Sequence, residues 1–253
     1  MGKQYKTAQV ARIVDIHPNT VRLYEELQLV SKAQRLENGY RVFSEYHIQQ
    51  FKIARIALKV EVLQNGLRKK MIHIIKLSAQ GEFQEAILCT NEYINQVRLE
   101  RKNAEEALEI SKRLFEEIED EENDIFLTRK QTAEDLQVTI DTLRNWELNG
   151  LFSIKRKQNG YRMYTESDIR RLKIIRTLRC ANYSLSSILR MLNANLENKK
   201  VDMREVIDTP EEHEDIVTAC DKLLTSLSNA ENNAEIILEQ LKVMKEKYMN
   251  VTL

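Results

Sequence analysis

Proline and glycine are scarce in this sequence, which holds two prolines and six glycines among 253 residues. Because proline interrupts both helices and sheets, its scarcity favours a mainly helical chain, and so little of either residue excludes a collagen-like repeat. The hydrophobic share of 42% is close to that of ordinary globular proteins and excludes a fully disordered chain. The length fits one large domain or two small ones.

Long apolar runs are also absent. The sequence has no run of the ~18 apolar residues that a membrane-spanning helix needs, and residues 1–14 lack the apolar centre of a signal peptide. The cysteines (Cys89, Cys180 and Cys220) are odd in number and have no CxxC spacing, which argues against a disulfide scaffold. We therefore expect a cytoplasmic protein without a membrane partner.

The sequence lacks the common patterns of enzymes and metal sites. The four histidines have no ligand spacing, and Cys89 has no second cysteine near it in the sequence. There is no glycine-rich phosphate loop, no HExxH and no nucleophile elbow. We expect no enzymatic activity, no bound metal and no cofactor.

The zero net charge hides an alternation of basic and acidic blocks. Residues 1–76 carry a net charge of +8, residues 77–124 carry −9, residues 125–200 carry +8 and residues 201–253 carry −7. Two basic blocks could bind a polyanion. Solvated helix faces produce similar runs, so charge alone leaves both interpretations open.

The charge alternation coincides with an internal repeat. Residues 20–25 (TVRLYE) align with residues 142–147 (TLRNWE), and residues 38–41 (NGYR) align with residues 159–162 (NGYR). The offset changes by one residue between these motifs, as a surface turn allows. A conserved order and spacing of this kind predicts two copies of one domain.

Helical spacing in the first repeat predicts a helix over residues 7–14 and a second from Pro18 to about Leu27, since proline is tolerated in a first turn. Two short strands are predicted at residues 29–31 and 40–43, around a turn that ends in Asn-Gly.

Further helices are predicted after the hairpin and in the second repeat. Ser44 opens the helix that follows the first hairpin. Thr139 and Thr165 stand at helix starts in the second repeat, and Ser184 or Ser186 opens a short last helix through Leu192.

Both acidic blocks have heptad spacing typical of a coiled coil. The pattern predicts one long helix over residues 83–122 and another over residues 211–250, with Cys220 on the apolar seam of the second. Because the predicted lengths are equal, we expect the two helices to be packing partners.

The order of these motifs resembles the MerR family of bacterial transcription regulators. Both copies contain the Thr-x-Arg-x-aromatic-Glu step and the Asn-Gly-Tyr-Arg step, and the resemblance covers nearly the whole chain. It implies a mainly α fold with two winged helix-turn-helix domains, each followed by a long coiled-coil helix. The expected parts are residues 1–80 (first winged domain), 81–124 (first long helix), 125–200 (second winged domain) and 201–253 (second long helix).

Members of this family usually carry one such domain and dimerise through antiparallel long helices. The resemblance therefore implies that one chain imitates the dimer, as an intrachain pseudo-dimer in which residues 83–122 pack antiparallel to residues 211–250. A homodimer of two chains is the alternative.

The resemblance also assigns double-stranded DNA as a partner and places the contact residues at each recognition helix and hairpin. In the first repeat they are His17, Asn19, Thr20, Arg22, Tyr24, Lys32, Arg35, Tyr40 and Arg41. In the second repeat they are Thr139, Thr142, Arg144, Trp146, Lys155, Arg156, Lys157, Tyr161 and Arg162. Phosphate contacts would set affinity and base contacts would set sequence preference.

Several of these side chains have a structural alternative. Tyr24 and Trp146 could pack between helix and wing, Arg22 and Arg144 could pair with nearby glutamates, and Tyr40 and Tyr161 could be hairpin packing residues.

The two copies differ at one position of the recognition helix. Asp141 stands where the first copy has Asn19, so it faces DNA unfavourably or complements a helix N-terminus. If it faces DNA, the two copies prefer different half-sites and the operator is asymmetric.

The resemblance implies a sequence-specific transcription regulator that binds a promoter and distorts it for RNA polymerase. An architectural DNA-binding protein, such as an excision or partition factor, is the first alternative. The second is a regulator gated by a small apolar effector between coil and DNA-binding domain. Its candidate lining residues are Tyr93, Phe115, Tyr183, Met244 and Tyr248, although an apolar stripe of this kind also fits a packed core.

Overall fold

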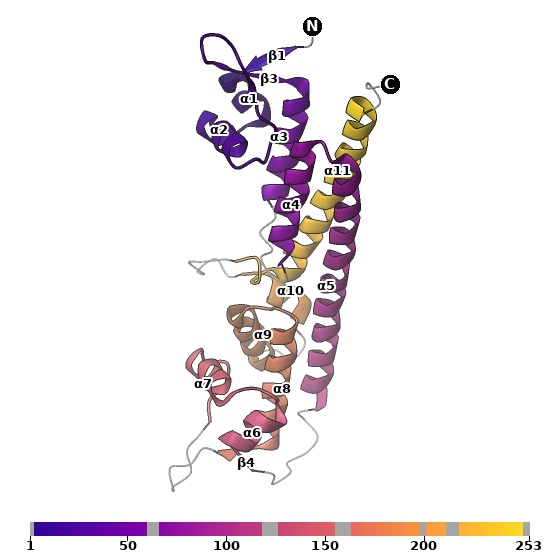
Figure 1. Ribbon diagram of the computed structural model, residues 1–253. Helices are drawn as coiled ribbons and strands as arrows, with labels where there is room; N and C mark the ends of the chain where they lie inside the picture. Colours follow the sequence, from indigo (N-terminus) through magenta and orange to yellow (C-terminus); the bar gives the residue numbers. More distant parts are fainter. Residues whose placement is uncertain are drawn as a thin grey trace. The chain divides into compact units, whose positions relative to one another are not determined.

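The computed structural model describes residues 3–59, 66–117, 126–154, 163–197, 201–210 and 218–249. Within these ranges the chain is mainly helical with short antiparallel strands, as the sequence predicted (Figure 1). The chain divides into two compact units: residues 1–99 with 226–253 form the first, and residues 100–225 form the second. No helix in the described ranges is both long and apolar enough to cross a membrane.

The first unit begins with a helix-turn-helix at the predicted positions. Helix α1 spans Thr7–Val14 and α2 spans Pro18–Glu26. Asp15 ends α1 in the left-handed conformation, with φ of 52°. The core beneath the two helices contains buried side chains from both helices and from the elements that follow, among them Val10, Val21, Phe43 and Phe51.

The wing of the first unit is a three-stranded antiparallel sheet. Strand β3 (Arg41–Ser44) lies between β1 (Gln4–Lys6) and β2 (Gln34–Arg35). Tyr5 pairs with Phe43 across the first strand pair, and Arg35 pairs with Arg41 across the second. Strand β1 was not predicted, because three residues are too few to show an alternating pattern.

The strand predicted at residues 29–31 is wrong. Leu29 and Val30 are buried, but they belong to no strand. The backbone N–H of Ser31 donates to the Gln50 side chain at 2.9 Å instead of to a neighbouring strand. The apolar pair is therefore a packing feature, and β2 begins at Gln34.

Two helices connect the wing to the long helices. Helix α3 (Glu45–Leu58) begins after Ser44, as predicted, and α4 (Leu67–Gln80) ends at Gly81. Gly81 has φ of 83°, a conformation that glycine adopts at little cost.

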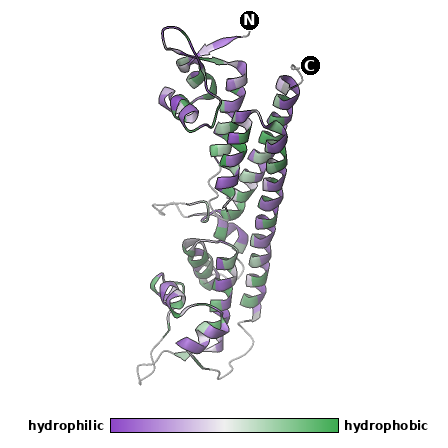
Figure 2. Ribbon diagram, viewed as in Figure 1, coloured by the Kyte–Doolittle hydropathy of each residue, from purple (hydrophilic) through white to green (hydrophobic). Residues whose placement is uncertain are grey.

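Helices α5 (Phe83–Glu117) and α11 (Leu223–Met249) run antiparallel where both belong to the first unit, at residues 83–99 and 226–249. Arg98 pairs with Glu231 at 2.6 Å, and Lys245 donates to Gln84. The partner's residue number falls as the number along α5 rises, which sets the opposite direction. Apolar residues at heptad spacing, such as Ile94 and Val97 in α5 and Ile237 and Leu241 in α11, are buried, and Figure 2 shows apolar residues along these helices.

The prediction of two long helices of equal length is wrong. Helix α5 has 35 residues and α11 has 27. A separate helix α10 (Met203–Asp208) precedes α11, and residues 219–222 form a turn, so Cys220 lies outside the seam. Residues 118–122 and 211–217 of the predicted helices lie outside the described ranges.

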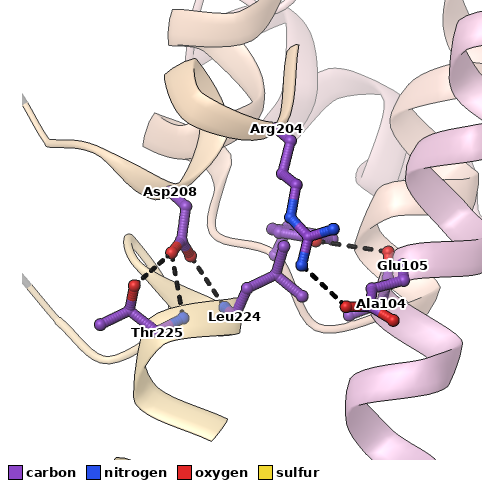
Figure 3. Close-up of polar contacts among 7 residues, drawn as sticks. Ala104, Glu105, Arg204, Asp208, Leu224 and Thr225 are labelled. Carbon is purple, nitrogen blue, oxygen red and sulfur yellow. Dashed lines mark hydrogen bonds and ion pairs between the residues drawn. The ribbon is translucent and has the colours of Figure 1, made fainter. Parts of the chain in front are cut away.

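The start of α11 is fixed by a cap that heptad spacing does not reveal. The Asp208 carboxylate accepts hydrogen bonds from the backbone N–H groups of Leu224 (2.8 Å) and Thr225 (3.0 Å) and from the Thr225 hydroxyl (Figure 3). An acceptor at this place satisfies donors that have no partner within the helix.

The second unit repeats the helix-turn-helix order. It contains β4 (Leu127–Thr128), α6 (Arg129–Asp135), α7 (Ile140–Leu148), β5 (Met163–Tyr164), α8 (Glu166–Cys180) and α9 (Leu185–Glu197). Strands β4 and β5 pair antiparallel. Thr139 and Thr165 cap α7 and α8 as predicted, and Ser184 receives the Ser187 backbone N–H. Helix α9 continues past the predicted end at Leu192 to Glu197.

Helix α10 is tied to the part of α5 that belongs to the second unit. Arg204 pairs with Glu105 at 2.8 Å (Figure 3). The Tyr183 hydroxyl, between α8 and α9, donates to the Ala104 carbonyl at 3.3 Å. These contacts hold the C-terminal half of α5 against the helices that follow the second helix-turn-helix.

Candidate nucleic-acid interface

Both recognition helices, α2 and α7, begin with a side-chain cap. His17 Nδ1 accepts the backbone N–H of Asn19 at 3.2 Å, and Thr139 Oγ accepts that of Thr142 at 3.0 Å. His17, Asn19 and Thr139 are exposed, whereas Thr20 and Thr142 are half-buried. The predicted contact residues at the two helix starts therefore lie on accessible turns, and two of them also fix the helix start.

Arg22 and Arg144 occupy the fifth position of α2 and α7. Both side chains are exposed, and neither makes a hydrogen bond or ion pair with any residue of the described ranges. The alternative of pairing with nearby glutamates therefore finds no support. Both guanidinium groups are accessible to a phosphate or to a guanine edge.

The aromatic residues two positions later differ between the copies. Tyr24 is half-buried and stacks on Phe51, with ring centroids 6.1 Å apart. Burial raises the pKa of Tyr24, so its hydroxyl keeps its proton and can donate it to a phosphate. Trp146 is only 5% exposed, which favours the packing alternative for this residue.

The first wing presents three accessible side chains. Lys32 and Arg35 are exposed, and Tyr40 at the turn is 71% exposed. An exposed ring of this size makes the packing alternative for Tyr40 a poor fit. The same three side chains are free to lie along a phosphate backbone.

Arg41 is held by the recognition helix. Its Nε donates to the carboxylate of Glu25, a residue that is 9% exposed. The other carboxylate oxygen accepts the Ala33 backbone N–H at 3.0 Å. Glu25 thus ties the wing to α2, and its carboxylate partly neutralises the charge of Arg41.

The matching glutamate of the second copy has a different partner. Glu147 pairs with Arg129 at 2.7 Å, and Arg129 also donates to the Tyr164 hydroxyl at 3.3 Å. These contacts, with Tyr164 first and Glu147 after it, raise the pKa of Arg129. Lys155, Arg156, Lys157, Tyr161 and Arg162 of the second wing lie outside the described ranges.

A second pair of matched arginines holds the turns between the helices. Arg55 donates to the Val14 carbonyl and to the Asp15 carboxylate, the latter at 2.7 Å. Arg176 donates to the Gln137 side chain at 3.1 Å. Sequence patterns gave these two arginines no role, because their partners are distant in sequence.

Asp141 lies exposed in the first turn of α7. A carboxylate at this place interacts favourably with the positive end of the helix dipole. It also adds a negative charge to the accessible face where the first copy has the neutral Asn19. The two recognition helices therefore differ in charge at their second residue.

The five apolar residues suggested as an effector site are split between the units. Tyr93 and Met244 are buried in the first unit, and Tyr183 is buried in the second. Burial of this degree favours the core interpretation for these three residues. In the described part of the chain no three His, Cys, Asp or Glu side chains come together as a metal site would require.

Comparison with known proteins is consistent with this arrangement. Residues 6–43 match the model of the MerR family regulatory protein, and residues 127–195 match that of the MerR HTH family regulatory protein. The chain is 38% identical over 68 residues to the HTH-type transcriptional regulator ZntR of Escherichia coli (strain K12), which covers 26% of this chain and 48% of that protein.

A second relative is the HTH-type transcriptional regulator CueR of Escherichia coli O6:H1. It is 36% identical over 53 residues, which cover 21% of this chain and 39% of that protein. The chain therefore spans about half the length, or less, of the curated relatives it matches. No solved structure matches the chain significantly.

Proposed function

We propose that this chain is a transcription regulator of the MerR family that binds double-stranded DNA through two helix-turn-helix regions in tandem. One observation carries the proposal. Arg22 and Arg144 stand at the same position of two capped recognition helices, exposed and unpaired among the described residues. Two such helices are the usual way to read two neighbouring half-sites in the major groove.

The two repeats bind unlike half-sites. Asn19 and Asp141 differ in charge at the start of the recognition helices, and the wing residue Arg41 is engaged by Glu25 in the first copy. A carboxylate next to phosphates weakens binding unless a base donor compensates for it. The preferred operator is therefore asymmetric.

A single chain supplies both repeats as a pseudo-dimer. The antiparallel contacts of Arg98 with Glu231 and Glu235, within the first unit, support this arrangement. A chain that holds two repeats can bend or untwist the DNA between its half-sites, and this distortion would help RNA polymerase engage the promoter. Light scattering should give a mass near 29.8 kDa; a two-chain mass would replace the pseudo-dimer by a homodimer.

The test is selection of bound fragments from the genomic DNA of the source organism at near-physiological salt. We expect a few sites inside promoters, each with two unlike halves. Fragments spread evenly, or centred on recombination sites, would instead identify an architectural protein. In vitro transcription on a recovered promoter then decides between activation and repression.

Matched variants tie the binding to the proposed residues. Arg22→Ala and Arg144→Ala should each weaken binding about tenfold, as expected for loss of one charged DNA contact. Arg113→Ala is the control, because Arg113 is an exposed arginine on α5 rather than on a recognition helix. Equal affinity of all three variants would contradict the proposed interface.

A further inference from the structure

The two repeats differ at the place where each helix-turn-helix joins the helices behind it. In the first unit this joint is filled. Tyr46, the second residue of α3, makes edge-to-face contacts with Tyr248 (centroids 4.8 Å apart) and Phe83 (6.2 Å). Gln50, one turn later, donates to the carbonyls of Ser78 and Ala79.

In the second unit the matching joint is hollow. Ser167 and Arg171 occupy the second and sixth positions of α8, where α3 has Tyr46 and Gln50. They line an open cavity of about 1000 Å³ that is also bordered by the C-terminal part of α5 and by residues around the start of α10. Because the second repeat has a serine where the first has a tyrosine, a space remains in the second repeat that is not a feature of the shared fold.

The cavity combines an apolar wall with one half-buried cation. Leu108 and Phe115 of α5 and Met203 of α10 supply apolar surface. Arg171 is half-buried and donates through Nε to the Leu151 carbonyl at 2.9 Å. Its two terminal nitrogens have no hydrogen-bond partner among the described residues.

The acidic residues around the cavity do not neutralise this cation. Glu105 is paired with Arg204, and Asp202 caps the start of α10. Glu109 and Glu116 are exposed on α5, where water screens them. Burial lowers the pKa of Arg171, and the negative charge of Asp168 partly offsets this effect.

We propose that this cavity binds an amphipathic organic anion, whose apolar body packs on Leu108, Phe115 and Met203 and whose charged oxygens bind the terminal nitrogens of Arg171. An arginine fork suits two oxygens of a carboxylate, sulfonate or phosphate. The volume is that of ordinary small-molecule sites, which combine apolar walls with few polar groups.

The bound anion also changes DNA binding by the second repeat, and this part rests on the proposed function. Arg171 holds the carbonyl of Leu151, three residues beyond the end of α7. A ligand that draws the guanidinium into the cavity therefore acts on the segment that follows the recognition helix. The anion is then an effector of one repeat only, because the matching joint of the first unit is filled.

The experiment uses the full chain and two fluorescent probes that differ by one charged group. The anion is 8-anilinonaphthalene-1-sulfonate, and N-phenyl-1-naphthylamine is its uncharged counterpart. We expect saturable binding of the anion. Arg171→Met should weaken the anion about tenfold, the cost of one charge-assisted contact, and should change the uncharged probe less than twofold.

Two further variants separate the cavity from general effects. Ser167→Tyr copies the residue of the first unit and should weaken both probes at least tenfold, because the ring fills the space. Arg113→Met removes an exposed arginine of α5 outside the cavity lining and should change neither probe. Circular dichroism and the emission of Trp146 verify that each variant is folded.

Two results overturn the ligand site: no saturable anion binding by the wild-type chain, or anion affinities of folded Arg171→Met and Ser167→Tyr within twofold of wild type. Titration of a recovered DNA fragment with saturating anion tests the effector role, for which we expect at least a threefold change that Arg171→Met abolishes. Anion binding without any DNA binding would refute the proposed function and leave the ligand site standing. DNA binding without anion binding would do the reverse.

Discussion

The contact between Glu25 and Arg41 allows a quantitative test of how the first wing is held. The substitution Glu25→Gln removes the charge but keeps an oxygen for the Ala33 N–H. The two side chains are 9% and 20% exposed, so the pair lies between a surface ion pair and a fully buried one. Exposed pairs contribute about 0–1 kcal/mol, and breaking a buried pair costs about 3–5 kcal/mol. We expect a loss of about 1–3 kcal/mol in the free energy of unfolding.

The assay is urea unfolding of the full chain, monitored by circular dichroism and by tryptophan emission. Circular dichroism reports all helices, whereas emission reports Trp146, the only tryptophan, in the second repeat. With a typical slope of about 1–3 kcal/mol per M, Glu25→Gln should lower the midpoint of one dichroism transition by about 1 M. The emission transition should stay in place. Glu147→Gln is the matched control and should move the emission transition instead.

Two outcomes would refute this reasoning. One is a change below about 0.5 kcal/mol in both transitions, which would place the pair among surface contacts. The other is an equal shift of both signals, which would mean that the two units do not unfold separately. The salt dependence of DNA binding is an independent test. Although Glu25→Gln is less stable, the release of Arg41 should steepen the dependence of the logarithm of its DNA-binding constant on the logarithm of salt concentration by up to about one unit.

Three more predictions concern other parts of the chain. Burial lowers the pKa of His47 below the ordinary 6.5. The unfolded chain therefore binds a proton more readily than the folded chain, so thermal stability should fall as the pH drops below about 6.5. The variant His47→Gln should show a smaller fall over the same pH range. Asp141→Asn should strengthen binding of a recovered fragment about two- to tenfold by removing a negative charge near phosphates; an unchanged anisotropy titration would show that this residue faces away from DNA. Arg98→Glu should lower the melting temperature of the first unit by calorimetry, and addition of Glu231→Arg should restore part of it; no rescue would contradict the antiparallel register.

Sequence patterns predicted the elements whose cause is local. The bounds of α1 and the caps at Ser44, Thr139 and Thr165 follow from residues that are neighbours in the chain. The start of α11 does not, because Asp208 and Leu224 are 16 residues apart and the heptad pattern runs through the turn between them.

The residues of the candidate interface also divide into those that sequence patterns identified and those that depend on tertiary contacts. The repeat match identified Arg22 and Arg144, whose exposure needs no tertiary partner. The partner of Arg41 could not be predicted, since Glu25 reaches it only after the wing has folded against α2. The cavity beside Arg171 could not be predicted either, because it is formed by the packing of the helices that line it. It is recognised as a difference between the repeats by comparison with the filled joint around Tyr46.

The first unit is assembled from both ends of the chain, and this affects how the protein folds during synthesis. Its contacts between Arg98 and Glu231 and between Gln84 and Lys245 join residues 133 and 161 positions apart. The ribosome releases the N-terminal repeat long before α11 has been synthesised. Until then the apolar side of α5 has no helix to pack against. The second unit is continuous from residue 100 to 225 and can fold first, although it is made later. Truncated chains that stop before residue 226 would therefore keep a foldable second unit and expose the unfinished first one to proteases.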